Sequence, residues 1–181
     1  GANELVEFEG GISGIALNLE ENVVGAVILG DPIAIKEGAE VRGLGKVAEI
    51  PVGENFIGRV VDGLANPIDN KGTIESTQTQ PTEVVAPDVA SRQPVNVPMQ
   101  TGIKAIDGMV PIGRGQRELI IGDRSTGKTA ICTDTIINQK GGDLVCIYVA
   151  IGQKVGKIAQ IQNLLEQHGA LDHTIIVAAS A

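Results

Sequence analysis

The run from Gly122 to Thr129, Gly-Asp-Arg-Ser-Thr-Gly-Lys-Thr, constrains the fold of this chain more than any other segment. Its spacing fits a Walker A loop, in which a glycine-rich backbone curls until several N–H groups point at phosphate oxygens. The mostly apolar run 118–121 predicts a strand before the loop, and 130–139 predicts a helix after it. This order suits phosphate binding because the helix adds the positive end of its dipole. The sequence therefore predicts a nucleotide-binding domain.

The residues of the loop have different predicted roles. Lys128 would reach the terminal phosphates, and the hydroxyl of Thr129 would ligate Mg²⁺. The predicted nucleotide-binding residues of the loop are Gly122, Asp123, Arg124, Ser125, Thr126, Gly127, Lys128 and Thr129, and the predicted metal ligand is Thr129. A glycine-containing turn that binds nothing is the competing interpretation, and it accounts less well for the four fixed positions and both flanks.

Composition limits the possible partners. The chain has 181 residues, 43% of them hydrophobic, which is enough for a buried core, and a net charge of −8. An acidic surface disfavours non-specific nucleic-acid binding, since phosphates need a basic surface. No apolar stretch has the length of a membrane span, so any membrane association is expected to be indirect. Cys132 and Cys146 have no neighbouring cysteine or histidine cluster and are interpreted as core thiols.

Residues 1–50 are rich in glycine and in short alternating segments such as 14–19 and 23–29. Tight-turn residues separate these segments, which predicts antiparallel strands in a small barrel. The segment 73–100 contains prolines and scattered valines, so we expect an extended chain that wraps a domain surface. A short helix is expected at 101–109, ending before Pro111, with a turn at 113–117.

After the loop, the apolar run 144–150 predicts a strand buried on both faces, as in a parallel sheet. A helical pattern with Ile158, Ile161 and Leu165 on one face follows, and Gly169 is placed to cap its C-terminus. Another strand is expected at 174–178. The fold class is therefore predicted as α/β, with a parallel sheet and crossover helices. No strand ending in Asp or Glu follows, so the Mg²⁺-organising carboxylate is expected to be missing and the nucleotide site to be half complete.

The most specific stretches lie on both sides of the phosphate loop. They are Pro98–Asp107, Pro111–Arg124, Thr135–Gln139 and Tyr148–Lys154. In these stretches, and along all 181 residues, the chain resembles the alpha subunit of the F-type ATP synthase. The resemblance implies a partial N-terminal β-barrel at 1–50 and a P-loop nucleotide-binding domain at 51–181, truncated at its C-terminus. We interpret the chain as a fragment of such a subunit.

Position 153 distinguishes alpha from beta in this resemblance. The catalytic beta subunit has a Gly-Glu-Arg here, whose glutamate polarises the attacking water, whereas this chain has Gly152-Gln153-Lys154. A neutral amide cannot act as a general base near neutral pH. The resemblance thus implies that Gln153 belongs to a site that holds nucleotide, with no catalytic residue. One departure from the alpha pattern is Ser125, where glutamine is usual, and it leaves predicted nucleotide binding intact.

The function expected from the resemblance is a non-catalytic subunit that binds ATP or ADP with Mg²⁺ in a rotary, proton-translocating ATP synthase. Beta subunits in an alternating hexamer and the central-stalk gamma subunit are the implied partners, with no nucleic acid. The implied location is the cytoplasmic face of a bacterial plasma membrane, or alternatively a mitochondrial inner membrane or plastid thylakoid. Two alternatives remain: a self-sufficient ATPase related to the beta subunit, secretion ATPases or Rho, and a purely structural role.

Overall fold

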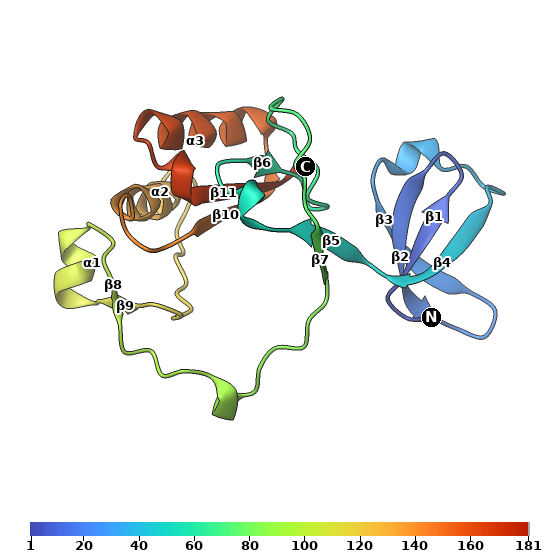
Figure 1. Cartoon of the computed structure of the whole chain (residues 1–181), viewed down its shortest axis with the longest axis horizontal. Coiled ribbons are helices and arrows are strands. Elements are labelled where there is room, and N and C mark those ends of the chain that lie inside the picture. Colours follow the sequence, from blue (N-terminus) through green and yellow to red (C-terminus); the bar gives the residue numbers. More distant parts are fainter. Residues whose placement is uncertain (181) are drawn as a thin grey trace. The chain divides into compact units, whose positions relative to one another are not determined.

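The computed structural model describes residues 1–180, which form two compact units (Figure 1). The N-terminal unit comprises Gly1–Val52 and Ser76–Val85, and the C-terminal unit comprises Gly53–Glu75 and the chain from Ala86 onward. A stretch from the middle of the sequence therefore belongs to the first unit.

The N-terminal unit is built from antiparallel strands, as the alternating segments predict. Its strands are β1 (Glu4–Phe8), β2 (Ile12–Leu19), β3 (Val24–Leu29), β4 (Val41–Val47), β5 (Glu49–Val52) and β7 (Gln78–Pro81). The first four form a sheet in the order β3-β2-β1-β4, and β5 pairs with β7. Gly10 and Gly11 have positive φ angles of 93° and 81°, which lets the chain turn tightly between β1 and β2. A short 3₁₀ turn at Pro32–Ala34 precedes β4.

The C-terminal unit contains a parallel sheet and three α-helices. Its elements are β6 (Val60–Val61), β8 (Pro98–Met99), α1 (Lys104–Met109), β9 (Ile112–Gly113), α2 (Lys128–Asn138), β10 (Cys146–Gln153), α3 (Val155–Gln167) and β11 (Thr174–Ser180). The sheet has the order β10-β11-β6, and both pairings are parallel. The predicted α/β fold class is confirmed, and α1 ends before Pro111 as expected.

The core of this unit lies between the sheet and the two longer helices. The helix α3 lies along one face of β10 and β11 (Figure 1), and α2 contributes Ile136 to the same core. The buried cluster consists of Val60, Ile136, Ala150, Ile158, Ile161, Leu165, Ala170, Leu171, Ile176 and Ala178. It contains the apolar face predicted for α3, since Ile158, Ile161 and Leu165 are all buried. Helical periodicity therefore identified the core-facing side of α3 correctly.

The C-terminus of α3 is capped as expected. Gly169 has a φ of 63°, a conformation that glycine adopts at little cost. The N–H of Gly169 donates to the carbonyl of Glu166 at 3.0 Å, and the N–H of Ala170 donates to that of Leu165 at 2.8 Å. These two bonds form a Schellman motif, which satisfies carbonyls left free at the helix end.

One expected strand is wrong. The residues before the phosphate loop, 118–121, have no strand pairing, and the side chains of Leu119 and Ile121 are 78% and 83% exposed. A strand exists only when a neighbour accepts and donates its backbone hydrogen bonds. In the described residues β10 pairs with β11 alone, so no strand of the sheet pairs with 118–121.

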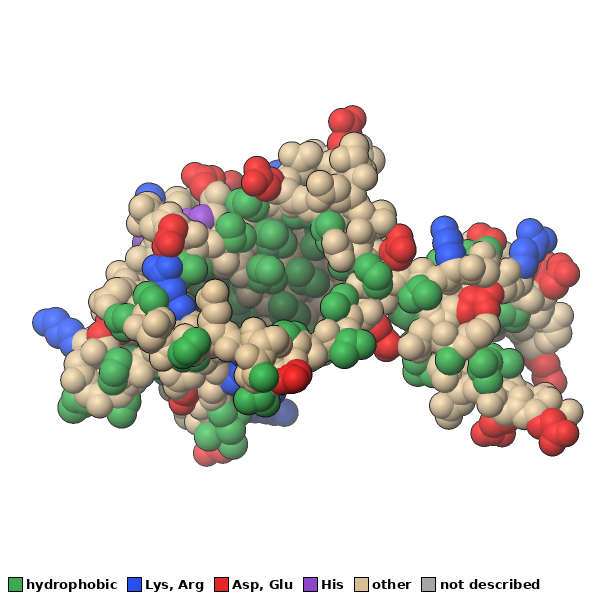
Figure 2. Space-filling model, turned by 60° about the horizontal axis from the view of Figure 1, so that its bottom comes forward, with side chains coloured by type: hydrophobic (Ala, Val, Ile, Leu, Met, Phe, Trp, Pro, Cys, Tyr) green, Lys and Arg blue, Asp and Glu red, His purple; other side chains and the backbone are tan. Residues whose placement is uncertain are grey.

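A second expectation, that the strand after α2 is buried on both faces, is also wrong. The face of β10 toward the helices includes buried Ala150, whereas the opposite face carries exposed apolar side chains: Val145, Ile147, Val149 and Ile151. Figure 2 shows hydrophobic side chains gathered in a hollow over this part of the unit. The core cluster with α3 lies on the other side, and on this face Ile147 and Val149 line an open apolar pocket of about 400 Å³ that residues of α2 also line.

The expectation for the valine-rich segment needs a similar correction. Within 73–100, the residues 78–81 form β7, but the valines predicted to anchor the chain are exposed: Val84, Val85, Val89, Val95 and Val97. A 3₁₀ turn at Val89–Ser91 is capped by Asp88, whose carboxylate accepts from the N–H of Ala90. The segment is thus held by the pairing of its ends, β7 with β5 and β8 with β9, and by local turns between them rather than by buried valines.

Candidate functional site

The phosphate loop connects the unpaired segment 117–121 to α2. Ser125 and Gly127 have positive φ angles of 62° and 95°, and the backbone between Asp123 and Gly127 is a run of turn and bend. For a serine this left-handed conformation is uncommon and costs free energy, which is typical of functional loops. The hydroxyl of Thr126 donates to the carbonyl of Asp123 at 2.8 Å and braces the turn. These local features give the compact curl that the motif predicts.

Gly127 is the N-cap residue of α2, and Lys128 is the first residue of the helix. The first N–H groups of any helix lack partners within it, and the dipole makes this end favourable for anions. Phosphate oxygens are suitable acceptors for such groups. The loop and the start of α2 therefore have the donors that a nucleotide's phosphates require.

The Lys128 ammonium folds back over the loop. It donates to the carbonyl of Gly122 at 2.5 Å and also to that of Asp123. Residues 122–127 are exposed, whereas Lys128 and Thr129 are half-buried. The lysine is thus positioned above the curled backbone, where a bound phosphate would meet its charge.

Thr129 lies in the first turn of α2, as the metal assignment requires. Among residues 1–180 no group of three or more His, Cys, Asp or Glu side chains could hold a metal ion. Mg²⁺ commonly binds through few protein ligands, with substrate phosphates and water completing its shell. The donor set of this chain therefore fits an ion that binds together with the nucleotide.

Gln153 lies at the carboxyl end of β10, which follows α2 in a parallel sheet. Parallel α/β proteins bind their ligands at the carboxyl ends of the strands. A register shift between Ile151 and Gln153, with Gly152 at a φ of 65°, accompanies this position. The amide Nε2 of Gln153 donates to the Tyr148 hydroxyl at 3.3 Å, and its Oε1 is buried without a partner in the described residues. No hydrogen bond joins Gln153 to the loop among these residues.

Two contacts around the site were not predicted. The Tyr148 hydroxyl accepts a hydrogen bond from the side chain of Gln153. The only feature of the sequence that could have indicated an irregular strand end here is Gly152, which has a positive φ. Arg114 lies in the turn expected at 113–117, and its guanidinium pairs with Asp143, with Nη1 and Oδ2 2.9 Å apart. This hydrogen-bonded pair lowers the pKa of the Asp143 carboxyl. No residue spacing in the sequence indicates that these two residues meet.

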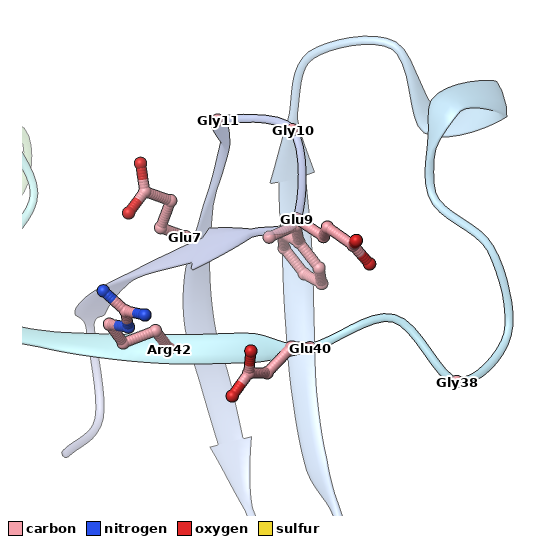
Figure 3. A pocket seen from close by; sticks show the side chains of 8 residues that line it. Glu7, Glu9, Gly10, Gly11, Gly38, Glu40 and Arg42 are labelled. Atoms are coloured by element: carbon pink, nitrogen blue, oxygen red, sulfur yellow. The ribbon is translucent and has the colours of Figure 1, made fainter.

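The N-terminal unit has a pocket of a different chemical character (Figure 3). It has a volume of about 390 Å³ and is lined by Glu7, Phe8, Glu9, Gly10, Gly11, Gly38, Glu40 and Arg42. Three carboxylates beside one guanidinium repel a polyphosphate. This pocket is therefore a poor site for the phosphates of a nucleotide.

The cysteines agree with their expected role as small apolar residues. Cys132 and Cys146 are free and half-buried, and Cys146 packs against the core cluster. Burial raises the pKa of both thiols, which favours the neutral, less reactive form. No helix in residues 1–180 combines the length and apolar character needed to cross a membrane.

Comparison with known proteins agrees with this architecture. Residues 102–181 match the nucleotide-binding domain of the ATP synthase alpha/beta family, and residues 2–45 match its beta-barrel domain. The expected β-barrel unit is thereby confirmed, together with the P-loop α/β domain. The barrel match covers the antiparallel sheet at the start of the chain, and the nucleotide-binding match covers most of the parallel sheet that follows it.

Curated relatives extend this likeness along nearly the whole chain. ATP synthase subunit alpha of Dehalococcoides mccartyi is 67% identical over 179 residues, which cover 99% of this chain and 36% of the relative. ATP synthase subunit alpha 2 of Hahella chejuensis is 62% identical over 178 residues, or 98% of this chain and 35% of the relative. The chain thus spans about a third of the length of these relatives. With both family domains in sequence order and this degree of identity, the chain belongs to the ATP synthase alpha/beta family.

Proposed function

We propose that this chain is part of a non-catalytic, nucleotide-binding alpha subunit of a rotary F-type ATP synthase. The observation that carries the proposal is the pairing of a complete phosphate loop with a neutral amide at position 153. The relatives' name, ATP synthase subunit alpha, supports the same assignment. A domain boundary near residue 50, between barrel and P-loop domain, is part of this proposal.

In this proposal the loop residues 122–129 hold the phosphates of ATP or ADP through their backbone N–H groups. Lys128 leaves the carbonyls of Gly122 and Asp123 and neutralises the terminal phosphates, while Thr129 contributes its hydroxyl to Mg²⁺. Mg²⁺ supplies charge neutralisation when bound. Gln153 orders the end of β10 near the bound nucleotide without accepting a proton from water.

The same proposal assigns partners and location. The alpha subunit would alternate with beta subunits around a gamma stalk, and would take part in ATP synthesis driven by an ion gradient. It would lie at the cytoplasmic face of a bacterial plasma membrane and would be attached to that membrane only through the membrane sector of the complex. The bacterial sources of the relatives support this location over an organelle.

The experiment is calorimetric titration of the chain with ATP, with and without Mg²⁺, followed by a phosphate-release assay on the same samples. We expect binding that Mg²⁺ strengthens, negligible turnover, and loss of binding in Lys128→Ala. Lys46→Ala is the matched control, since it removes an exposed lysine from β4 of the N-terminal unit.

Each other outcome has a definite meaning. Robust phosphate release that depends on Lys128 would contradict the non-catalytic assignment and favour a self-sufficient ATPase. A chain that is folded by circular dichroism but binds no nucleotide would contradict the binding role and favour a structural one. Equal binding by Lys128→Ala would place the nucleotide elsewhere.

A further inference from the structure

An ion pair links the two connections on either side of the phosphate loop. Arg114 follows β9, and Asp143 lies in the connection between α2 and β10. The guanidinium contacts both carboxylate oxygens: Nη1 lies 2.9 Å from Oδ2, and Nη2 lies 2.9 Å from Oδ1. This two-pronged geometry fixes relative orientation as well as distance, which a single contact from lysine could not do.

The backbone of Arg114 is itself held in place. Its N–H donates to the carbonyl of Val97 at 2.8 Å, next to the pairing of β8 with β9. The two members of the ion pair are 29 residues apart in sequence. The pair therefore closes a ring of chain that contains the segment 115–121, the phosphate loop and all of α2.

This closure matters because the segment entering the loop has no strand pairing in the described residues. Leu119 and Ile121 project into solvent, and Ile120 is the one apolar residue of the segment that faces a pocket beside α2. On the other side, α2 is fixed by Ile136 in the core cluster. The entry to the loop is thus held by the Arg114 ion pair, by the hydrogen bonds between Gln116 and Gly113 and by the contact of Ile120 with the pocket, whereas its exit is held by the packed helix.

A competing interpretation is that the pair is an ordinary surface contact. The side chains of Arg114 and Asp143 are 36% and 74% exposed, and exposed pairs contribute little to global stability. Two features argue for a local role instead. The contact is bidentate, and the Nε atom of Arg114 is itself shielded from solvent in the described residues.

We propose that the Arg114–Asp143 pair positions the phosphate loop for nucleotide by holding its entry segment against the α2–β10 connection. Arg114 is a positioning residue that acts through the backbone and does not touch phosphate. The inference rests on the proposed nucleotide-binding function. It predicts that breaking the pair loosens residues 115–121 first and weakens nucleotide binding as a result.

The test uses charge reversal and its rescue. Arg114→Glu and Asp143→Arg are made singly and together, and Arg92→Glu is the matched control for an exposed arginine in the same unit. We expect each single variant to weaken Mg-ATP binding by about five-fold, the upper end for one exposed pair, with little change in melting temperature. The double variant should restore most of the affinity, and the control should bind like the original chain.

A second measurement does not need nucleotide. Amide hydrogen exchange of the ligand-free chain should accelerate at 115–121 in both single variants and slow again in the double variant. Absence of nucleotide binding by the original chain would overturn the proposed function, while the exchange data would still test the pair. Unchanged exchange and affinity in the single variants, or no rescue by the swap, would overturn the inference.

Discussion

Two apolar segments flank α2, and only one of them is a strand. The run 118–121 precedes the phosphate loop, and β10 follows the helix; both are rich in the β-branched residues that strands favour. β10 pairs in parallel with β11, and its residue Ala150 is completely buried. The earlier run has no partner, and its side chains at Leu119 and Ile121 project into solvent.

The difference shows that apolar, β-favouring sequence does not by itself make a strand. What distinguishes β10 is a neighbour in register together with the core cluster and α3 on one of its faces. The phosphate loop is consequently anchored unequally, firmly through α2 and weakly through the segment that enters it. Substitutions on the two sides of the loop should therefore have very different effects.

The largest contrast is expected between two leucines. Leu165 of α3 is fully buried in the core cluster, whereas Leu119 is 78% exposed. Leu165→Ala should lower the free energy of unfolding by about 2–5 kcal/mol, because it leaves a cavity in the core. Leu119→Ala should change it by less than about 0.5 kcal/mol. Urea denaturation followed by circular dichroism measures both.

An equal cost for the two leucine variants would break the comparison. It would mean that the segment before the loop packs as tightly as α3 in solution. Leu165→Met is a useful companion, since it keeps the side-chain volume and should cost less than about 1.5 kcal/mol.

The two edges of the parallel sheet differ in a similar way. At the far edge, Arg59 donates to both carboxylate oxygens of Asp69 at 2.7 and 2.9 Å, and the N–H of Val60 in β6 donates to the same carboxylate at 3.2 Å. The Asp69 side chain has no exposed surface. The β10 edge has no comparable ion pair within residues 1–180. The β6 edge therefore has an ion pair of its own, whereas among the described residues the β10 edge, like the segment 118–121, has none.

The second-largest effect is expected at Asp69. Asp69→Asn keeps the shape but removes the charge that Arg59 needs, and should cost about 1.5–3 kcal/mol, the range for hydrogen bonds to charged groups. The hydrogen bonds from Arg59, with help from the N–H groups of Lys71 and Val60, hold the Asp69 pKa well below its ordinary 3.8. A cost near zero in urea denaturation would show that the pair contributes nothing.

The same pair gives a pH dependence with a definite sign. Because the folded state lowers the Asp69 pKa, its contribution is fully present above the ordinary pKa of about 3.8 and is lost as the pH falls below it. The original chain should therefore lose more stability between pH 7 and pH 3 than Asp69→Asn. A parallel loss in both, measured by melting temperature, would assign the acid sensitivity to other carboxylates.

The comparison also shows what the sequence could and could not predict. Features set by near neighbours were predictable: the turn of the phosphate loop, the apolar face of α3 and the Gly169 cap all follow from local spacing. The outcomes for 118–121 and for the outer face of β10 depend on which elements lie beside them, and local spacing carries no such information. For the same reason the Arg114–Asp143 and Tyr148–Gln153 contacts were missed, since each depends on how the chain folds around the loop.

The smallest effect is expected on the uncovered face of β10. Ile151 is 77% exposed, so Ile151→Lys should change the free energy of unfolding by no more than about 1 kcal/mol, the span of strand propensities. The substitution should instead reduce self-association, because an exposed apolar strand at a sheet edge is a template for pairing with another chain and lysine discourages it. Sedimentation velocity over a range of concentrations measures this change directly.

A stability loss as large as that of Leu165→Ala would show that Ile151 is buried in solution and that this face of the sheet is covered. Unchanged self-association, with stability also unchanged, would show that the free edge of β10 is not where copies of the chain meet. Either result also tests the contrast between β10 and the segment 118–121. In the described residues the outer edge of β10 and the segment 118–121 both lack a neighbouring strand.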